Sequence, residues 1–149
     1  MINIRKITQE DKKYVLSILQ ECNIKDVKEN EVVNKYFENG YLGCIAEYIR
    51  DDYTSEYVGY CFIKNPQIKP ETLSVVYSLY RNQGIATKLR NYTIETYKDQ
   101  IEGNLIYSYS DVWNIASIKS LLNSRYEIND FIRNSNGNNV LEFIHTIKR

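Results

Sequence analysis

The fold class of this chain is decided by the stretch Leu73-Ser74-Val75-Val76-Tyr77-Ser78-Leu79-Tyr80-Arg81-Asn82-Gln83-Gly84-Ile85-Ala86. It predicts a short apolar strand, a connection, and an Arg-x-x-Gly-x-Ala turn that opens a helix. Such a turn presents backbone N–H groups without intrahelical acceptors, and the helix dipole favours an anion there, most often a phosphate. Arg81 would add a planar cation for phosphate oxygens, and Gly84 would let the backbone approach them closely.

The turn resembles the acetyl-CoA pyrophosphate loop of the Gcn5-related N-acetyltransferase (GNAT) family, whose pattern is Arg/Gln-x-x-Gly-x-Gly/Ala. The Tyr80-Arg81 pair and the strand before it are similar to the end of the family's fourth strand. A second similarity is Asp111-Val112-Trp113-Asn114-Ile115-Ala116-Ser117-Ile118, which carries the family's Asn-x-x-Ser/Ala at the start of its fourth helix.

Hydrophobic periodicity predicts the other elements. Helices are expected after a Thr8-x-x-Asp11 capping signal and over 29–38, 84–98 and 114–124. Strands are expected at 2–7, 41–49, 57–63, 73–77, 105–110, 126–132 and 140–147. The order is β-α-α-β-β-β-α-β-α-β-β, an α/β (α+β) chain that we read as one domain over 1–149. This order matches the GNAT family nearly end to end, so the resemblance implies the acyl-CoA N-acyltransferase fold, with a mixed central sheet of about seven strands flanked by about four helices.

Apolar spacing also predicts which side chains are buried. In the helix over 84–98 the apolar pattern is Ile85, Leu89, Tyr92 and Tyr97, and in the helix over 114–124 it is Ile115, Ile118 and Leu122. The cysteines at 22, 44 and 61 show neither a metal nor a disulfide spacing, so we expect small buried side chains.

Composition excludes several classes of protein. The chain has 149 residues, 19 basic and 19 acidic side chains, so a nucleic acid is not the expected partner. No apolar run reaches the roughly 18 residues that span a bilayer, and the N-terminus lacks a secretory apolar core. We therefore expect a cytoplasmic protein without a membrane or metal partner.

The resemblance implies acetyl-CoA as the cosubstrate and no metal. Its pantetheine arm would pair with the backbone of Ser74, Val75 and Val76, like an added strand. Its pyrophosphate would lie beside Arg81 on the backbone amides of Asn82, Gln83, Gly84, Ile85, Ala86 and Thr87. Asn114 would contact the arm, although an Asn at this position is also a good helix N-cap.

The implied reaction moves an acetyl group directly from the thioester to a primary amine of a small molecule or protein. The amine must be neutral, because an ammonium has no lone pair. The N–H of Val76 is the expected oxyanion donor. Many family members place a Glu on the fourth strand as general base; here Glu71 is one residue out of place, and a solvated carboxylate is its alternative.

The departing thiolate of coenzyme A can need a proton. The family often supplies it from a Tyr seven residues after the Asn of the fourth helix, but that position is Leu121 here, which we expect in the core. Tyr126, Tyr109 and Tyr107 are the nearby alternatives; packing is the simpler role for each, and Tyr126 is the one that we name as the candidate donor. The loss is tolerable, because a thiol of pKa near ~8.5 leaves reasonably well as thiolate. The one histidine, His145, is not expected to be catalytic.

Two acidic groups could attract a cationic acceptor, and a solvated charged surface would explain both equally well. They are Glu21, Asp26, Glu29 and Glu31, and then Asp51, Asp52 and Glu56. Homodimers are common in this fold, so the resemblance leaves a homodimer open. Two other functions remain: a non-catalytic acyl-CoA-binding or regulatory module with this fold, and an unrelated phosphate-binding α/β protein.

Overall fold

The computed structural model describes residues 1–22, 27–39, 42–133 and 137–149. The helices and strands are β1 (Ile2–Lys6), α1 (Lys12–Glu21), α2 (Val27–Asn39), β2 (Leu42–Ile49), β3 (Ser55–Lys64), β4 (Glu71–Val76), α3 (Ile85–Tyr97), β5 (Leu105–Asp111), α4 (Ile115–Asn123), β6 (Glu127–Arg133) and β7 (Asn139–Thr146). Short 3-10 helices are η1 (Gln9–Asp11), η2 (Ser78–Tyr80) and η3 (Lys98–Gln100). The order of strands and α-helices is the predicted one.

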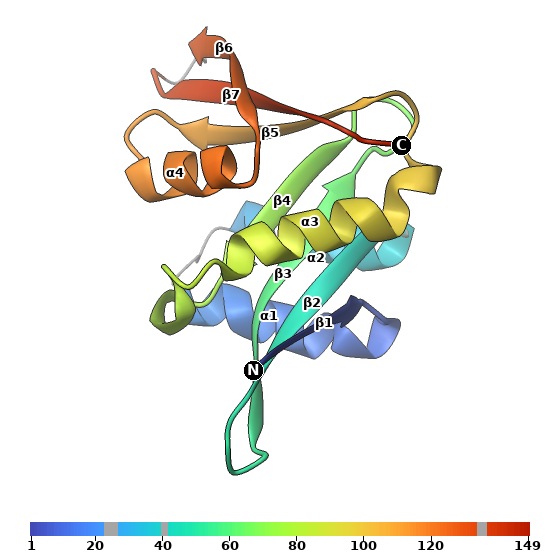
Figure 1. Ribbon diagram of the computed structural model, residues 1–149, viewed down its shortest axis with the longest axis vertical. Coiled ribbons are helices and arrows are strands. Elements are labelled where there is room, and N and C mark those ends of the chain that lie inside the picture. The colour runs from blue at the N-terminus through green and yellow to red at the C-terminus, as the bar shows by residue number, and fades with distance from the viewer. Residues whose placement is uncertain (23–26, 40–41, 134–136) are drawn as a thin grey trace.

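All seven strands form one mixed sheet in the order β1-β2-β3-β4-β5-β7-β6. Neighbours are antiparallel except β4 and β5, which run parallel. Among the described residues the β4–β5 ladder has one pair, Glu71 opposite Tyr107. Beyond that pair the strands diverge, as Figure 1 shows, and we call β1–β4 the N-terminal half-sheet and β5–β7–β6 the C-terminal half-sheet.

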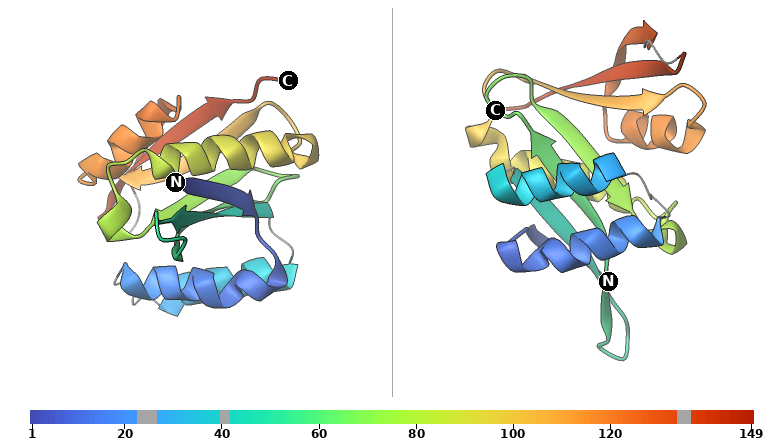
Figure 2. Two further views of the ribbon diagram at one scale, coloured as in Figure 1. Left: turned by 60° about the horizontal axis from the view of Figure 1, so that its bottom comes forward. Right: turned by 180° about the vertical axis from the view of Figure 1, so that it is seen from behind.

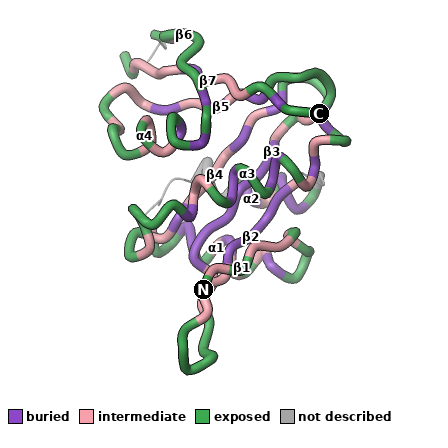
Figure 3. The backbone as a smooth tube through the Cα atoms, viewed as in Figure 1, coloured by how far each residue is buried: buried purple, intermediate pink, exposed green. Residues whose placement is uncertain are grey.

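Helices cover both faces of the N-terminal half-sheet, with α1 and α2 on one face and α3 on the other (Figure 2). Two buried clusters follow from this layering. Val15 of α1 packs with Tyr60 and Phe62 of β3, whereas Leu89 of α3 packs with Cys61. Figure 3 shows buried segments in the middle of these layers and the exposed β2–β3 turn outside them. Burying each such large apolar side chain contributes about 1.5–3 kcal/mol, so the two clusters hold the layers together.

The entry into α1 confirms the predicted capping signal. Thr8 and Asp11 form a capping box, in which the backbone N–H of Thr8 donates to Asp11 Oδ2 at 2.8 Å. Both Nη atoms of Arg5 donate to the same carboxylate, each at 2.8 Å. The hydrogen bond from Arg5 is the largest cause that lowers the pKa of Asp11, which is 2% exposed.

Two of the predicted helix faces were partly wrong. In α3, Tyr92 is 43% exposed, and Thr93 is buried instead, because the buried stripe follows steps of four residues from Ile85 through Leu89. In α4, Ile115 and Leu122 are exposed, and the buried position is Leu121. Ile118 packs against the core as predicted, and Leu121 was expected there too, so only the two outer members of the predicted face, Ile115 and Leu122, were wrong.

The cysteines follow the prediction in two of three cases. Cys44 and Cys61 are fully buried, and burial raises their pKa values to about 11 and about 12. Cys22 is only half-buried and lies at the end of α1 beside β4. No helix in the described ranges has the length and apolar content needed to cross a bilayer.

Candidate active site

The turn before α3 exposes uncapped backbone amides. Gly84 is the N-cap, in the left-handed region with φ 75°, and Asn82 also has a positive φ of 64°. The first backbone hydrogen bond of the helix runs from the Lys88 N–H to the Gly84 carbonyl at 3.1 Å. No described residue accepts from the N–H groups of Ile85, Ala86 or Thr87. No other group lies within 4 Å of a Cβ built on Gly84, so the turn is open to an anion.

Arg81 lies beside these amides, and a hydrogen bond to the end of β4 holds its side chain. Its Nε donates to the Val76 carbonyl at 3.1 Å, and the side chain is otherwise exposed. None of the described carboxylates forms an ion pair with Arg81. Its positive charge therefore remains free to meet a phosphate next to the amides.

Tyr80 anchors the same turn to the β2–β3 turn. Its hydroxyl donates to Glu56 Oε2 at 2.8 Å and accepts from Arg50 Nη2 at 2.9 Å. Arg50 also donates to Glu56, at 2.8 Å. These three hydrogen bonds hold Tyr80, and with it the start of the turn into α3, against the β2–β3 turn.

The edge of β4 that faces β5 carries backbone groups that β3 does not use. Tyr77 donates its N–H to the Val58 carbonyl at 2.7 Å, which fixes the hydrogen-bonding phase of the β3–β4 ladder. Because antiparallel ladders alternate, the N–H and C=O groups of Ser74 and Val76 point away from β3. Two contacts agree: Arg81 reaches the carbonyl of Val76, and Ser108 Oγ donates to the Thr72 carbonyl at 3.1 Å. An extended ligand along this edge would meet Ser74 and Val76.

Val75 has a different role from the one predicted for its backbone. It lies opposite Tyr60, and the same alternation directs its N–H and C=O toward β3. Its carbonyl lies 3.0 Å from the position of a Cβ on Gly59, which agrees with that direction. Of the three residues that the resemblance indicates, only two can therefore offer backbone groups to a ligand between β4 and β5.

Asn114 lies at the start of α4 and caps it. Its Oδ1 accepts from the Ser117 N–H at 3.1 Å, so the N-cap alternative holds. The amide Nδ2 has no partner among the described residues, so a second contact to a ligand is compatible with the cap.

The position expected for a catalytic Tyr lies in the core. Leu121 is 1% exposed and packs in the cluster beneath α3, as its spacing predicted. Tyr126 is 2% exposed, and its hydroxyl shares a hydrogen bond of 2.7 Å with Thr72 Oγ1. Burial raises the pKa of Tyr126, which keeps the hydroxyl protonated. Tyr126 thus lies against β4, but it is closed off by protein.

Glu71 begins β4 and is paired. Its Oε1 lies 3.5 Å from Lys64 Nζ, and both side chains are about one quarter exposed. The β3–β4 ladder has no register shift, so no bulge turns Glu71 to the face of Thr72 and Ser74. Its carboxylate therefore lies on the α1–α2 face of the sheet.

Glu142 is a residue that the sequence did not single out. It is 7% exposed in β7 and accepts from Tyr109 Oη at 2.9 Å, Asn129 Nδ2 at 2.8 Å and Lys69 Nζ at 3.2 Å. Burial raises the pKa of Glu142, but the hydrogen bonds from these three groups outweigh it and lower the pKa overall. A single Glu between Leu141 and Phe143 gives no signal of burial, so only the structure reveals it.

The two predicted acidic groups contribute one residue each to a cavity of about 370 Å³. Its lining residues are Tyr14, Ser17, Ile18, Glu21, Ser55, Glu56, Tyr57 and Tyr77. Asp26 lies outside the described residues, while Asp51 and Asp52 lie in the exposed β2–β3 turn.

His145 lies against the main chain at Arg125. The Nδ1 of His145 lies 3.3 Å from the Arg125 carbonyl, and burial lowers its pKa. Among the described residues, no three His, Cys, Asp or Glu side chains are placed to hold a metal ion.

Comparison with known proteins gives a fold and no close relative. No family model matches the chain, and no curated protein matches it. Solved structures match over nearly its whole length. A GNAT-family structure from Desulfovibrio desulfuricans has a TM-score of 0.79 at 10% identity, over 98% of this chain and 99% of that one. The chain has the GNAT acyltransferase fold.

Two further solved structures share this fold. The GNAT-family acetyltransferase from Bacillus cereus has a TM-score of 0.77 at 16% identity, over 100% of this chain and 99% of that one. The yncA protein from Salmonella typhimurium was solved with its cofactor acetyl-CoA, and it has a TM-score of 0.73 at 11% identity, over 99% of this chain and 94% of that one. At these sequence identities the similarity shows the fold alone. The chemistry of the site must therefore be argued from the residues of this chain.

Proposed function

We propose that this protein is an acetyl-CoA-dependent N-acetyltransferase that transfers an acetyl group directly to a primary amine. The observation that carries the proposal is the set of uncapped amides before α3, which continues into the free edge of β4 where β4 and β5 diverge. A diphosphate fits the amides, and an amide-containing arm fits the strand edge.

The proposed binding roles follow from this geometry. The amides from Asn82 to Thr87 would hold the diphosphate, with the guanidinium of Arg81 beside them. Ser74 and Val76 would pair with the arm, and the Asn114 Nδ2 would donate to it. These residues fit acetyl-CoA because their donors, apart from the Nε of Arg81, have no other partner among the described residues.

For the chemical step, the N–H of Val76 is the proposed donor to the oxyanion, since it points toward the same edge. The amine attacks the thioester carbonyl as a neutral group, the carbon–sulfur bond breaks, and the proton lost by the amine must reach a base. Glu71 is the predicted base, directly or through water. Its pairing with Lys64 on the α1–α2 face leaves the water-mediated path as the one to test.

Two tyrosines compete for the role of proton donor to the thiolate. Extending the register from Glu71 and Tyr107 puts Tyr109 level with Leu73, near the point where the strands converge. Tyr109 is half-buried and connected to Glu142, whereas Tyr126 is closed off. Tyr109 is therefore the stronger candidate, although Tyr126 was the residue that the sequence favoured.

A non-catalytic acyl-CoA-binding module is the second candidate, and the buried Leu121 favours it because the usual donor is absent. Thermal-shift measurements with acetyl-CoA, coenzyme A and ATP test binding. A ligand at 100 times its Kd adds about 2.7 kcal/mol to the unfolding free energy. Free-thiol release with a panel of amines then separates enzyme from binder. A shift with ATP alone would contradict both candidates. Cytoplasmic location and a homodimer stay predictions.

A further inference from the structure

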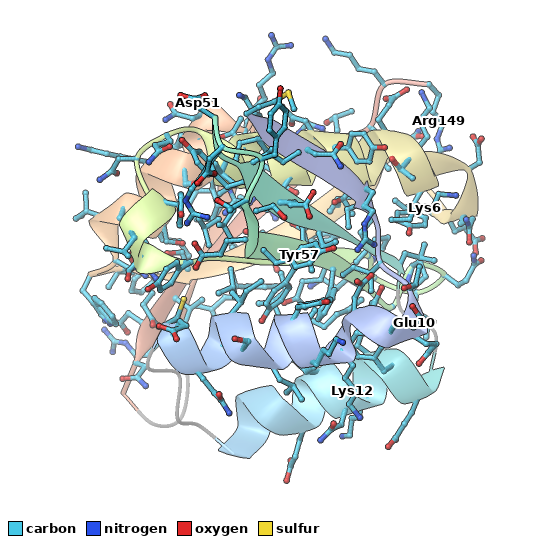
Figure 4. All side chains as sticks on the ribbon, turned by 90° about the horizontal axis from the view of Figure 1, so that it is seen from below. Lys6, Glu10, Lys12, Asp51, Tyr57 and Arg149 are labelled. Atoms are coloured by element: carbon cyan, nitrogen blue, oxygen red, sulfur yellow. The ribbon has the colours of Figure 1, made fainter. Side chains whose placement is uncertain are left out.

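A cavity lies between α1 and the start of β3, on the opposite face of the sheet from α3. Its volume of about 370 Å³ is many times the roughly 30 Å³ of a water molecule, and it falls in the range of about 300–1,000 Å³ of small-molecule sites. Figure 4 shows Tyr57 between the sheet and α1. The cavity is thus large enough for a small organic group.

The charge of this cavity is negative. Glu21 and Glu56 line it, and no Lys or Arg does. Glu56 is partly neutralised by Arg50 at 2.8 Å. Glu21 forms no ion pair with any Lys or Arg that the structure describes. Burial, and then the neighbouring Glu21, raise the pKa of Tyr77, so its hydroxyl stays a hydrogen-bond donor.

The walls of the cavity suit a cation. The ring centroids of Tyr14 and Tyr57 lie 4.2 Å apart, and Tyr77 supplies a third ring. Lys13 Nζ already lies 5.0 Å from the Tyr14 centroid and Arg5 Cζ lies 5.4 Å from the Tyr57 centroid, so these two rings are engaged. Tyr77, over which no described Lys or Arg lies, is the ring open to a ligand cation. Aromatic rings with a carboxylate favour an organic ammonium or guanidinium, with about 0.5–2 kcal/mol from each cation–π contact.

The cavity adjoins the end of β4. Tyr77, which lines it, directly follows Val76 in the chain. Cys22, which directly follows Glu21, donates its S–H to the Val76 carbonyl at 3.5 Å. One wall residue of the cavity is thus the chain neighbour of the proposed oxyanion donor.

A group held by these carboxylates is not the group that reacts. A carboxylate favours the charged form of a neighbouring amine, and an ammonium has no lone pair for attack. The amine that attacks the thioester must therefore lie outside the cavity, while a different part of the same acceptor lies inside it.

We propose that the cavity binds a second positive group of the acceptor, so that the substrate is a dibasic amine with an ammonium or guanidinium in addition to the amine that is acetylated. This inference rests on the proposed function for the transfer itself, but the cation site can be tested without acetyl-CoA.

The binding test uses calorimetry on the full chain with α,ω-diaminoalkanes of three to six carbons and the matching neutral diols. We expect a diamine to bind and its diol not to bind. Glu21→Gln should weaken diamine binding at least tenfold. Glu10→Gln, an exposed Glu before the other end of α1, is the matched control and should leave it unchanged. Equal affinities of wild type and Glu21→Gln, or no diamine binding, would overturn the proposal.

The kinetic test compares a diamine with the monoamine of equal chain length at saturating acetyl-CoA. We expect kcat/KM to be at least tenfold higher for the diamine, and Glu21→Gln to remove most of that difference through KM. A monoamine that reacts as well as the diamine would contradict the substrate class. If diamines bind but acetyl-CoA does not, the proposed function fails while the cation site stands.

Discussion

Arg81 donates from Nε to the carbonyl of Val76 at 3.1 Å. The bond turns the guanidinium back onto the strand end, and it places the positive charge beside the uncapped amides before α3. The same carbonyl receives the S–H of Cys22. One main-chain oxygen therefore joins the end of α1, the end of β4 and the turn before α3.

We expect Arg81→Ala to weaken acetyl-CoA binding by roughly tenfold to a hundredfold, since a hydrogen bond to a charged group contributes about 1.5–3 kcal/mol. Arg81→Lys should recover only part of the affinity, because an ammonium cannot bond to Val76 and present a planar fork together. Calorimetric Kd values measure this, with the exposed Arg133→Ala on β6 as control. An unchanged Kd in Arg81→Ala would show that the turn does not bind the coenzyme.

Gly84→Ala should cost about 1 kcal/mol of unfolding free energy, because φ is 75° and no clash accompanies the new Cβ. Gly103→Ala is a matched control, with φ 80° and equally open space. Both variants should lower the melting temperature alike, but only Gly84→Ala should also weaken acetyl-CoA binding. If both variants bind acetyl-CoA as tightly as wild type, the coenzyme does not contact the main chain at residue 84, and the assignment of the turn is wrong.

Tyr109→Phe should lower kcat by about 10²–10⁴-fold at unchanged KM for acetyl-CoA if Tyr109 is the general acid. Tyr126→Phe should instead lower the unfolding free energy by about 1 kcal/mol, because it leaves Thr72 Oγ1 without its buried partner. Steady-state kinetics and denaturant unfolding on both variants separate the roles. A kcat loss in Tyr126→Phe alone would return the acid to the residue favoured by the sequence.

The Arg5–Asp11 pair should make stability depend on acid pH. Its hydrogen bond from Arg5 lowers the folded pKa of Asp11 below 3.8, so the stabilisation is present above that value and is lost as pH falls through the folded pKa. Asp11→Asn should cost about 1–3 kcal/mol at pH 7 and progressively less as the pH falls toward and below the folded pKa. Urea unfolding across this pH range tests this, with the exposed Asp99→Asn as control. Equal losses at all these pH values would refute the electrostatic origin.

The sequence predicted the order of the strands and α-helices and the Gly84 turn that opens α3, because these depend on local signals. Alternation, the Thr8–Asp11 cap and a Gly before a helix each act within a few residues. The burial of Leu122 and Tyr92 was wrong, since the choice between adjacent positions of an apolar helix depends on what packs against it. No local pattern carries that information.

From the sequence, only the part of the candidate site that is formed by backbone groups could be predicted. Uncapped amides follow from Gly84, but the direction of the N–H groups of Ser74 and Val76 required the register with β3. Glu142 has partners from three other segments, 33, 13 and 73 residues away along the chain. The meeting of Glu21 with Glu56 likewise depends on the fold, because each residue looked like ordinary solvated surface in the sequence.

The single ladder position between β4 and β5 has a mechanical consequence. With one backbone pair, Glu71 opposite Tyr107, the two half-sheets share little of the cooperative hydrogen bonding that stiffens an ordinary sheet. A substrate arm inserted along Ser74 and Val76 would serve as a splint across this seam. The bound substrate would then contribute part of the rigidity of the sheet. Each catalytic cycle would lower that rigidity when product leaves and restore it when the next substrate binds.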